Sequence, residues 1–125
     1  MNKYGNRKTV VGGYAFDSIA EARRYQELKI LEKAGEIFNL ELQPKFVLVP
    51  KTKTRRAVTY TADFRYYEPC GRCFPDKDNC PCTDSRDIVE DVKSPATAKD
   101  KAYIIKRNLF EYQNPNIEFK EVVAI

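Results

Sequence analysis

The sequence predicts an α/β fold, with one mixed central sheet flanked by helices and the element order αβββαβ. An apolar stripe at helical spacing lies near the start, alternating apolar and polar residues fill the middle, and a second helical stretch precedes a last short strand. A chain of 125 residues is long enough to bury a core of its own. We therefore expect a single domain over residues 1–125.

The composition restricts the chemistry that this chain can perform. It contains no histidine, which excludes Ser-His and Cys-His nucleophiles and any histidine-based metal site. The net charge is +4, a small excess whose distribution matters more than its total. No apolar run is long enough to span a bilayer and no signal peptide is evident, so we expect a cytoplasmic protein without a membrane partner. Acids and lysines must carry any catalysis.

The first predicted helix covers residues 18–34. Ser18 and Glu21 have the spacing of a capping box, and Gly35 provides a stop. The apolar stripe between them consists of Ala22, Tyr25, Leu28 and Leu31. Two interpretations of Glu21 stay open: it completes the helix cap, or it faces a cleft from the first turn as a catalytic acid.

Residues 37–49 are expected to form a first strand that is bent or bulged at Gln43-Pro44, and residues 58–67 a second strand with one apolar face. Asp63 lies in the middle of that second strand, on its polar face, where Asp is unfavourable without a partner. A metal ion or Arg65, two residues further on, would supply one.

Cations cluster in the connection between these two strands. Residues 51–56 contain Lys51, Lys53, Arg55 and Arg56. Such a basic loop either contacts the phosphates of DNA or is a solvated run of charge.

The four cysteines predict a structural zinc site. Cys70, Cys73, Cys80 and Cys82 lie within a Gly- and Pro-containing loop that we expect to be an insertion at about residues 69–84. Four thiolates close the coordination shell, so this zinc would staple the loop without taking part in a reaction.

Residues 88–94 form the third expected strand. On a strand, Asp91 and Lys93 point to one face while Ile88, Glu90 and Val92 point to the other. A carboxylate beside an ammonium can hold a divalent metal and position a water, or it can be an ordinary ion pair on a solvated strand.

A second helix is expected to begin at Thr97-Ala98-Lys99-Asp100 and to run to about Tyr112. Its predicted apolar stripe consists of Ala102, Ile105, Leu109 and Tyr112, and its basic faces include the candidate DNA contacts Lys99, Lys101 and Lys106. Residues 117–123 then form the last strand.

In this order the chain resembles the PD-(D/E)XK nuclease superfamily. More closely it is similar to a small phage-encoded family of uncharacterised, Holliday-junction-resolvase-like endonucleases. The segments that carry the resemblance are Lys3-Tyr4-Gly5-Asn6, Phe16-Asp17-Ser18, Glu21-Ala22-Arg23-Arg24-Tyr25, Leu42-Gln43-Pro44-Lys45-Phe46, Thr61-Ala62-Asp63-Phe64-Arg65-Tyr66 and Val89-Glu90-Asp91-Val92-Lys93. Ala62 stands where the superfamily motif has proline.

The resemblance implies a restriction-endonuclease-like core and a role for each matching residue. Asp63 and Asp91 would be the two motif acids that hold Mg²⁺ or Mn²⁺, Lys93 the motif lysine, and Glu21 the acid added from the first helix.

We therefore expect a metal-dependent DNA endonuclease that acts on branched recombination or replication intermediates, as a homodimer in the cytoplasm of a bacterial host cell. The alternatives are a nuclease for other phage DNA structures and a non-cutting, zinc-stapled module that binds nucleic acid. A partner protein of the host is a further possibility.

Overall fold

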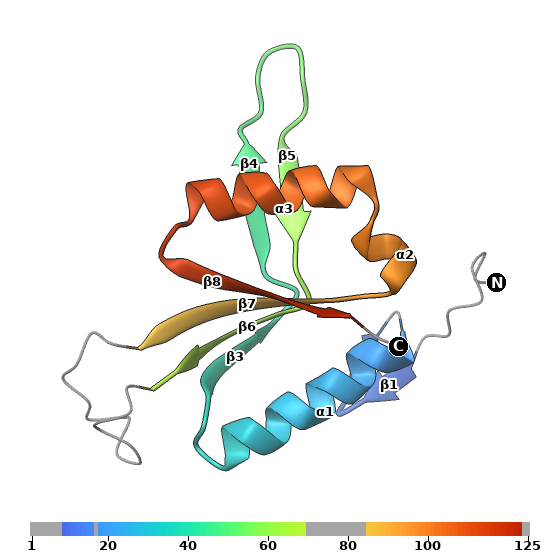
Figure 1. Cartoon of the computed structure of the whole chain (residues 1–125), viewed down its shortest axis with the longest axis vertical. Coiled ribbons are helices and arrows are strands. Elements are labelled where there is room, and N and C mark those ends of the chain that lie inside the picture. Colours follow the sequence, from blue (N-terminus) through green and yellow to red (C-terminus); the bar gives the residue numbers. More distant parts are fainter. Residues whose placement is uncertain (1–8, 17, 70–84, 124–125) are drawn as a thin grey trace.

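The computed structural model describes residues 9–16, 18–69 and 85–123 (Figure 1). The elements in chain order are β1 Thr9–Val11, β2 Tyr14–Phe16, α1 Ile19–Lys33, β3 Phe38–Leu42, β4 Lys45–Val49, β5 Val58–Thr61, β6 Phe64–Glu68, β7 Arg86–Lys93, α2 Pro95–Ala98, α3 Lys101–Gln113 and β8 Ile117–Val123. The central sheet has four strands in the order β3-β6-β7-β8. The pairs β3-β6 and β6-β7 are antiparallel and β7-β8 is parallel, so the predicted mixed sheet is confirmed.

The two long helices cover opposite faces of this sheet (Figure 1). Alternation along β7 explains the two layers, because Ile88 and Val92 pack with α1 whereas Val89 packs with α3. β7 therefore has apolar side chains on both faces, as expected for a central strand covered on both sides.

Helix α1 agrees with the sequence prediction. Ser18 caps it by accepting a hydrogen bond from the Glu21 backbone N–H at 3.1 Å. At the other end Gly35 has φ 83°, and the Glu36 N–H bonds the Leu31 carbonyl at 2.9 Å in a Schellman motif. The short hairpin β1-β2 packs on α1 through Phe16, whose ring centroid lies 5.1 Å from that of Tyr25.

The predicted continuous strand over residues 58–67 is wrong. The strand is interrupted at Ala62-Asp63, between β5 and β6, and this interruption lies beside the one at Gln43-Pro44, between β3 and β4. Hydrogen bonds join the breaks, from the Ala62 N–H to the Pro44 carbonyl at 3.0 Å and from the Gln43 N–H to the Asp63 carbonyl at 2.9 Å. The bend is needed because Pro44 has no N–H for a continuous ladder and Gln43 has a positive φ of 52°.

Beyond the bend, β4 and β5 leave the central sheet and pair as a separate two-stranded ribbon. The inner side chains Leu48 and Tyr60 pack in the core cluster that includes Phe110 of α3. In Figure 1 the turn of this ribbon extends past α3.

Two details of the second helical region differ from the prediction. Ser94 caps the short helix α2, and Asp100 caps α3 by accepting from the Tyr103 N–H at 3.1 Å, so α3 does not begin at Thr97. The predicted stripe is right only for Leu109, which packs against the core: Ile105 and Tyr112 are 59% and 85% exposed, and the buried side chains are Tyr103 and Phe110. Tyr103 and Phe110 pack in the core cluster that includes Leu48, Tyr60 and Val89.

Among the described residues, no helix is long and apolar enough to cross a membrane.

Candidate active site

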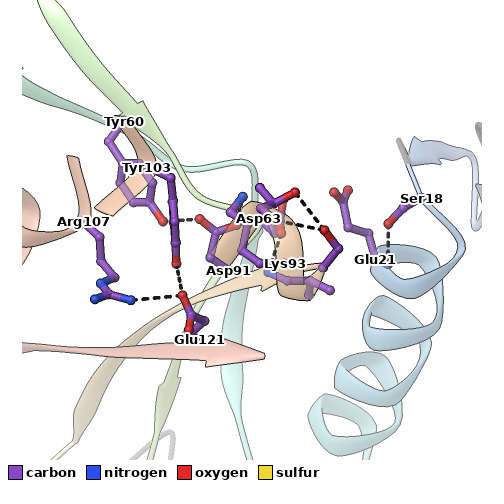
Figure 2. Close-up of polar contacts among 12 residues, drawn as sticks. Ser18, Glu21, Tyr60, Asp63, Asp91, Lys93, Tyr103, Arg107 and Glu121 are labelled. Carbon is purple, nitrogen blue, oxygen red and sulfur yellow. Dashed lines mark hydrogen bonds and ion pairs between the residues drawn. The ribbon is translucent and has the colours of Figure 1, made fainter. Parts of the chain in front are cut away.

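Three parts of the chain meet at one end of β7 (Figure 2). The bend between β5 and β6 carries Asp63, the C-terminal end of β7 carries Asp91 and Lys93, and the first turn of α1 carries Glu21. The structure therefore brings together all four residues for which the sequence predicted catalytic roles.

Asp91 is fully buried and has different neighbours at its two carboxylate oxygens. Oδ2 accepts a hydrogen bond from the hydroxyl of Tyr60. Oδ1 lies 2.8 Å from Nζ of Lys93 in an ion pair, but within the described residues it accepts no hydrogen bond of good geometry. The ion pair that the sequence allowed is thus present, but it is buried at the Asp91 end and its Lys93 side chain is only 20% exposed.

Asp63 is directed toward the end of β7. Its Oδ2 accepts a hydrogen bond of 2.7 Å from the backbone N–H of Val92, the residue between Asp91 and Lys93. The alternative prediction, that Arg65 is the partner of Asp63, is wrong, because Arg65 forms a bidentate pair with Asp87 at 2.7 and 3.1 Å. The break at Asp63 interrupts the side-chain alternation, since Ala62 and Phe64, two residues apart, pack in different core clusters.

Burial raises the pKa of Asp63 to about 8, and the negative charges of Asp91 and Glu21 add to this effect. The hydrogen bond from the Val92 N–H acts in the opposite direction and lowers the pKa. Burial and the neighbouring negative charges thus disfavour the ionised form of Asp63, a condition that a bound cation relieves.

The structure shows Glu21 in the helix cap, and its role as a catalytic acid stays a prediction. Its backbone N–H completes the Ser18 cap, while its side chain extends from α1 on the side where Asp63 lies (Figure 2). The negative charge of Glu21 raises the pKa of Asp63.

Sequence reasoning missed a second group of residues on the α3 side of the site. The Tyr103 hydroxyl donates to Oε1 of Glu121 at 2.6 Å, and Arg107 donates to the same oxygen at 3.0 Å. The centre of the Tyr103 ring lies 5.0 Å from Nζ of Lys93. Glu121 is the register partner of Asp91 on β8, a proximity that only the parallel strand pairing reveals.

Tyr60 was also missed, because it falls on the apolar face of the alternating pattern and resembles an ordinary core residue. Burial and the neighbouring charge of Asp91 raise the pKa of its phenol, so the hydroxyl remains a proton donor to that carboxylate.

On the opposite face of β7, Glu90 is fully buried and belongs to a different network. Arg24 of α1 donates to both of its carboxylate oxygens at 2.7 Å, and the Tyr66 hydroxyl donates to one of them. The pair raises the pKa of Arg24 and ties α1 to β7.

The donor set at Asp63 and Asp91 fits a hard divalent cation. Within the described ranges there is no group of three or more His, Cys, Asp or Glu residues close enough to hold a metal by themselves. Mg²⁺ commonly uses one or two carboxylates and keeps several waters, so the two side chains are ligands of the kind that it prefers. The Asp91 oxygen without a hydrogen bond and the raised pKa of Asp63 both favour such an ion.

The predicted DNA contacts occupy two places. Lys51, Lys53, Arg55 and Arg56 are all exposed in the turn of the β4-β5 ribbon, where the Thr52 N–H bonds the Arg55 carbonyl at 3.0 Å. Lys99 is exposed at the end of α2, Lys101 is exposed as the first residue of α3, and Lys106 is partly buried on α3. Cys70, Cys73, Cys80 and Cys82 lie outside the described residues, so the zinc site stays a prediction.

The fold and site define a mixed α/β domain with a carboxylate and lysine cluster at the end of its central sheet. The chain belongs to the family described as "Protein of unknown function (DUF1064)", which matches residues 1–124. Neither the curated proteins nor the solved structures gave a match.

Proposed function

We propose that this chain is a metal-dependent DNA endonuclease with a restriction-endonuclease-like core. The observation that carries the proposal is the meeting of Asp63, Asp91 and Lys93 at the end of β7, where two carboxylates and an ammonium share one partly desolvated space. Phosphodiester hydrolysis requires groups of these kinds to bind a cation, position a water and stabilise developing charge.

Each residue has a separate role in this proposal. Asp63 and Asp91 hold Mg²⁺ or Mn²⁺, which when bound neutralises charge on the phosphate. Lys93 orients the attacking water and stabilises its developing negative charge. The water oxygen loses a proton to solvent and forms a bond to phosphorus while the bond to the 3′ oxygen breaks. The 3′ oxygen takes up a proton from solvent, which leaves 5′-phosphate and 3′-hydroxyl ends, as the superfamily resemblance implies. Glu21 adds negative charge beside Asp63 and so favours cation binding.

The proposed substrate is branched DNA, and the proposed active form is a homodimer that cuts two strands symmetrically. The exposed cations of the ribbon turn, together with Lys99, Lys101 and Lys106, supply contacts to phosphate. The cysteine loop would be held by structural zinc.

The test is cleavage of a labelled four-way junction and of its matching linear duplex by the wild type and by Lys93→Ala. Magnesium, manganese and chelator form the three metal conditions. Lys33→Ala is the control, because Lys33 is exposed in the last turn of α1, at the end opposite to Glu21. We expect paired cuts in the junction that disappear in chelator and in Lys93→Ala but persist in Lys33→Ala.

A second candidate is a non-cutting module that binds nucleic acid. The four exposed cations in the ribbon turn favour binding whether or not the site is catalytic. Junction binding without a cut under any metal condition would support this candidate and contradict the endonuclease.

A further inference from the structure

Lys93 has a second neighbour besides Asp91. Its Nζ lies 5.0 Å from the centre of the Tyr103 ring, within the range of a cation-π interaction. The ammonium is therefore held between a carboxylate oxygen at 2.8 Å and an aromatic face. Because the Lys93 side chain is only 20% exposed, water competes weakly with both neighbours.

Tyr103 is itself held firmly in place. It is 8% exposed, its hydroxyl donates to Glu121 at 2.6 Å, and its backbone N–H is capped by Asp100. Cζ of Arg107 lies 5.7 Å from the centre of the same ring. In Figure 2 Arg107 lies to the left of Tyr103 and Asp91 to the right. The ring orientation is thus fixed before any ligand binds.

We propose that Tyr103 is a positioning residue that holds the Lys93 ammonium at the site through its ring face. This inference rests on the proposed endonuclease function, because it assigns Lys93 a part in the reaction. Asp91 cannot serve a divalent cation and the Lys93 ammonium equally well, since both would compete for Oδ1. The ring of Tyr103 gives the ammonium a neighbour that does not depend on Asp91, so Lys93 stays close to the water that it orients.

An ordinary core role for Tyr103 makes different predictions. Tyr103→Phe keeps the ring and removes the hydroxyl bond to Glu121, whereas Tyr103→Leu removes both. Tyr112→Leu is the matched control, because Tyr112 lies on the same helix and is 85% exposed. If the ring face positions Lys93, Tyr103→Phe should behave like the wild type and Tyr103→Leu should not. If the hydroxyl is what matters, the two variants should lose the same amount of activity.

The first readout does not depend on catalysis. In protein with ¹³C-labelled lysine, the Lys93 side-chain signals are identified by their absence in Lys93→Arg. The ring current of Tyr103 should shift these signals upfield relative to the other lysines, in the wild type and in Tyr103→Phe. The shift should be lost in Tyr103→Leu and kept in Tyr112→Leu. Unshifted Lys93 signals in the wild type would overturn the proposal even if Tyr103→Leu fails to fold.

The second readout is single-turnover and steady-state cleavage of the four-way junction. We expect Tyr103→Leu to lower kcat about tenfold with KM changed less than about twofold, and Tyr103→Phe to keep kcat within about threefold. Equal losses in both variants would assign the effect to the hydroxyl and overturn the ring role. A wild type that cuts no DNA contradicts the endonuclease, whereas full cutting by a folded Tyr103→Leu contradicts the role of Tyr103 alone.

Discussion

Two consecutive acids of β7 are fully buried on opposite faces, and each receives a tyrosine hydroxyl. Asp91 accepts from Tyr60 and Glu90 from Tyr66. The two acids differ in their cationic partner. Arg24 donates to both oxygens of Glu90, whereas Lys93 lies near one oxygen of Asp91. Both oxygens of Glu90 therefore accept hydrogen bonds, whereas Oδ1 of Asp91 has the Lys93 ion pair without a hydrogen bond.

The raised pKa of Asp63 predicts how the stability of the metal-free protein depends on pH. Between the ordinary pKa of 3.8 and the folded-state value of about 8, the folded protein binds one proton more than the unfolded chain. The free energy of unfolding should therefore fall as the pH rises through this window. Asp63→Asn should remove that slope and stabilise the metal-free protein at pH 8 by on the order of 5 kcal/mol.

Urea denaturation at several pH values between 4 and 8, in chelator, measures this effect. Glu36→Gln is the control, because Glu36 is exposed beyond the end of α1. If Asp63→Asn and the wild type have the same slope, Asp63 does not retain a proton in the folded state.

Tyr60→Phe should destabilise the protein although it removes a single oxygen. The change leaves Oδ2 of the fully buried Asp91 without its hydroxyl donor, and a buried acceptor that loses its partner costs about 1–3 kcal/mol. Thermal denaturation of Tyr60→Phe and of the exposed control Tyr112→Phe measures the cost. Equal melting temperatures for the two variants would show that the Tyr60 hydroxyl does not stabilise Asp91.

Helix α1 is attached to the sheet by one charged contact as well as by its apolar face. Ala22, Tyr25 and Leu28 are buried, and Arg24, one position away from this face, reaches Glu90. This contact holds the helix that carries Glu21 close to the strand that carries Asp91. The position of Glu21 in the site is thus linked to a residue pair outside the site.

Arg24→Ala should lower the free energy of unfolding by about 2–3 kcal/mol, because it leaves the buried Glu90 carboxylate without its cation and with the Tyr66 hydroxyl as its remaining donor. The partial exposure of Arg24 limits the loss. Arg23→Ala, at an exposed neighbouring position, should change stability by less than about 0.5 kcal/mol. Urea denaturation compares the two, and an equal effect would contradict the anchoring role of the Arg24–Glu90 pair.

Across the domain, the paired bends at Gln43-Pro44 and Ala62-Asp63 divide one long hairpin into two halves with different structural roles. The half formed by β3 and β6 builds the central sheet, and the half formed by β4 and β5 packs on α3 and presents a basic turn. Asp63 lies at the junction between the two halves. The bend therefore positions a candidate metal ligand and separates the basic turn from the central sheet.

Neutralising the ribbon turn should weaken DNA binding without affecting the core. In a variant with alanine at Lys51, Lys53, Arg55 and Arg56, all exposed, we expect weaker binding whose dependence on salt is shallower. The slope of log K against log[salt] should decrease by about 0.9 for each phosphate that the variant no longer neutralises. Fluorescence anisotropy with junction DNA at several salt concentrations measures this slope, with alanine at Lys29 and Lys33 of α1 as the control. An unchanged slope would exclude the turn from the DNA interface.

The layers of this protein follow from local patterns in its sequence. Helix α1 with its Ser18 cap and Gly35 stop, the alternation of β7 and the strand after α3 depend on local chemistry, so they could be predicted without the fold. The proximity of Asp91 and Lys93 followed from the period of a strand.

The connections and contacts between these elements became evident from the three-dimensional arrangement alone. The break at Asp63, the burial of Tyr103 and Phe110 in place of the predicted stripe of α3, and the neighbours Tyr60 and Glu121 of Asp91 depend on contacts between residues far apart in sequence. A local pattern records how each segment divides its side chains between faces, but it holds no information on which other segment covers them. The candidate acids could therefore be named from sequence, whereas the residues that hold and orient them could not.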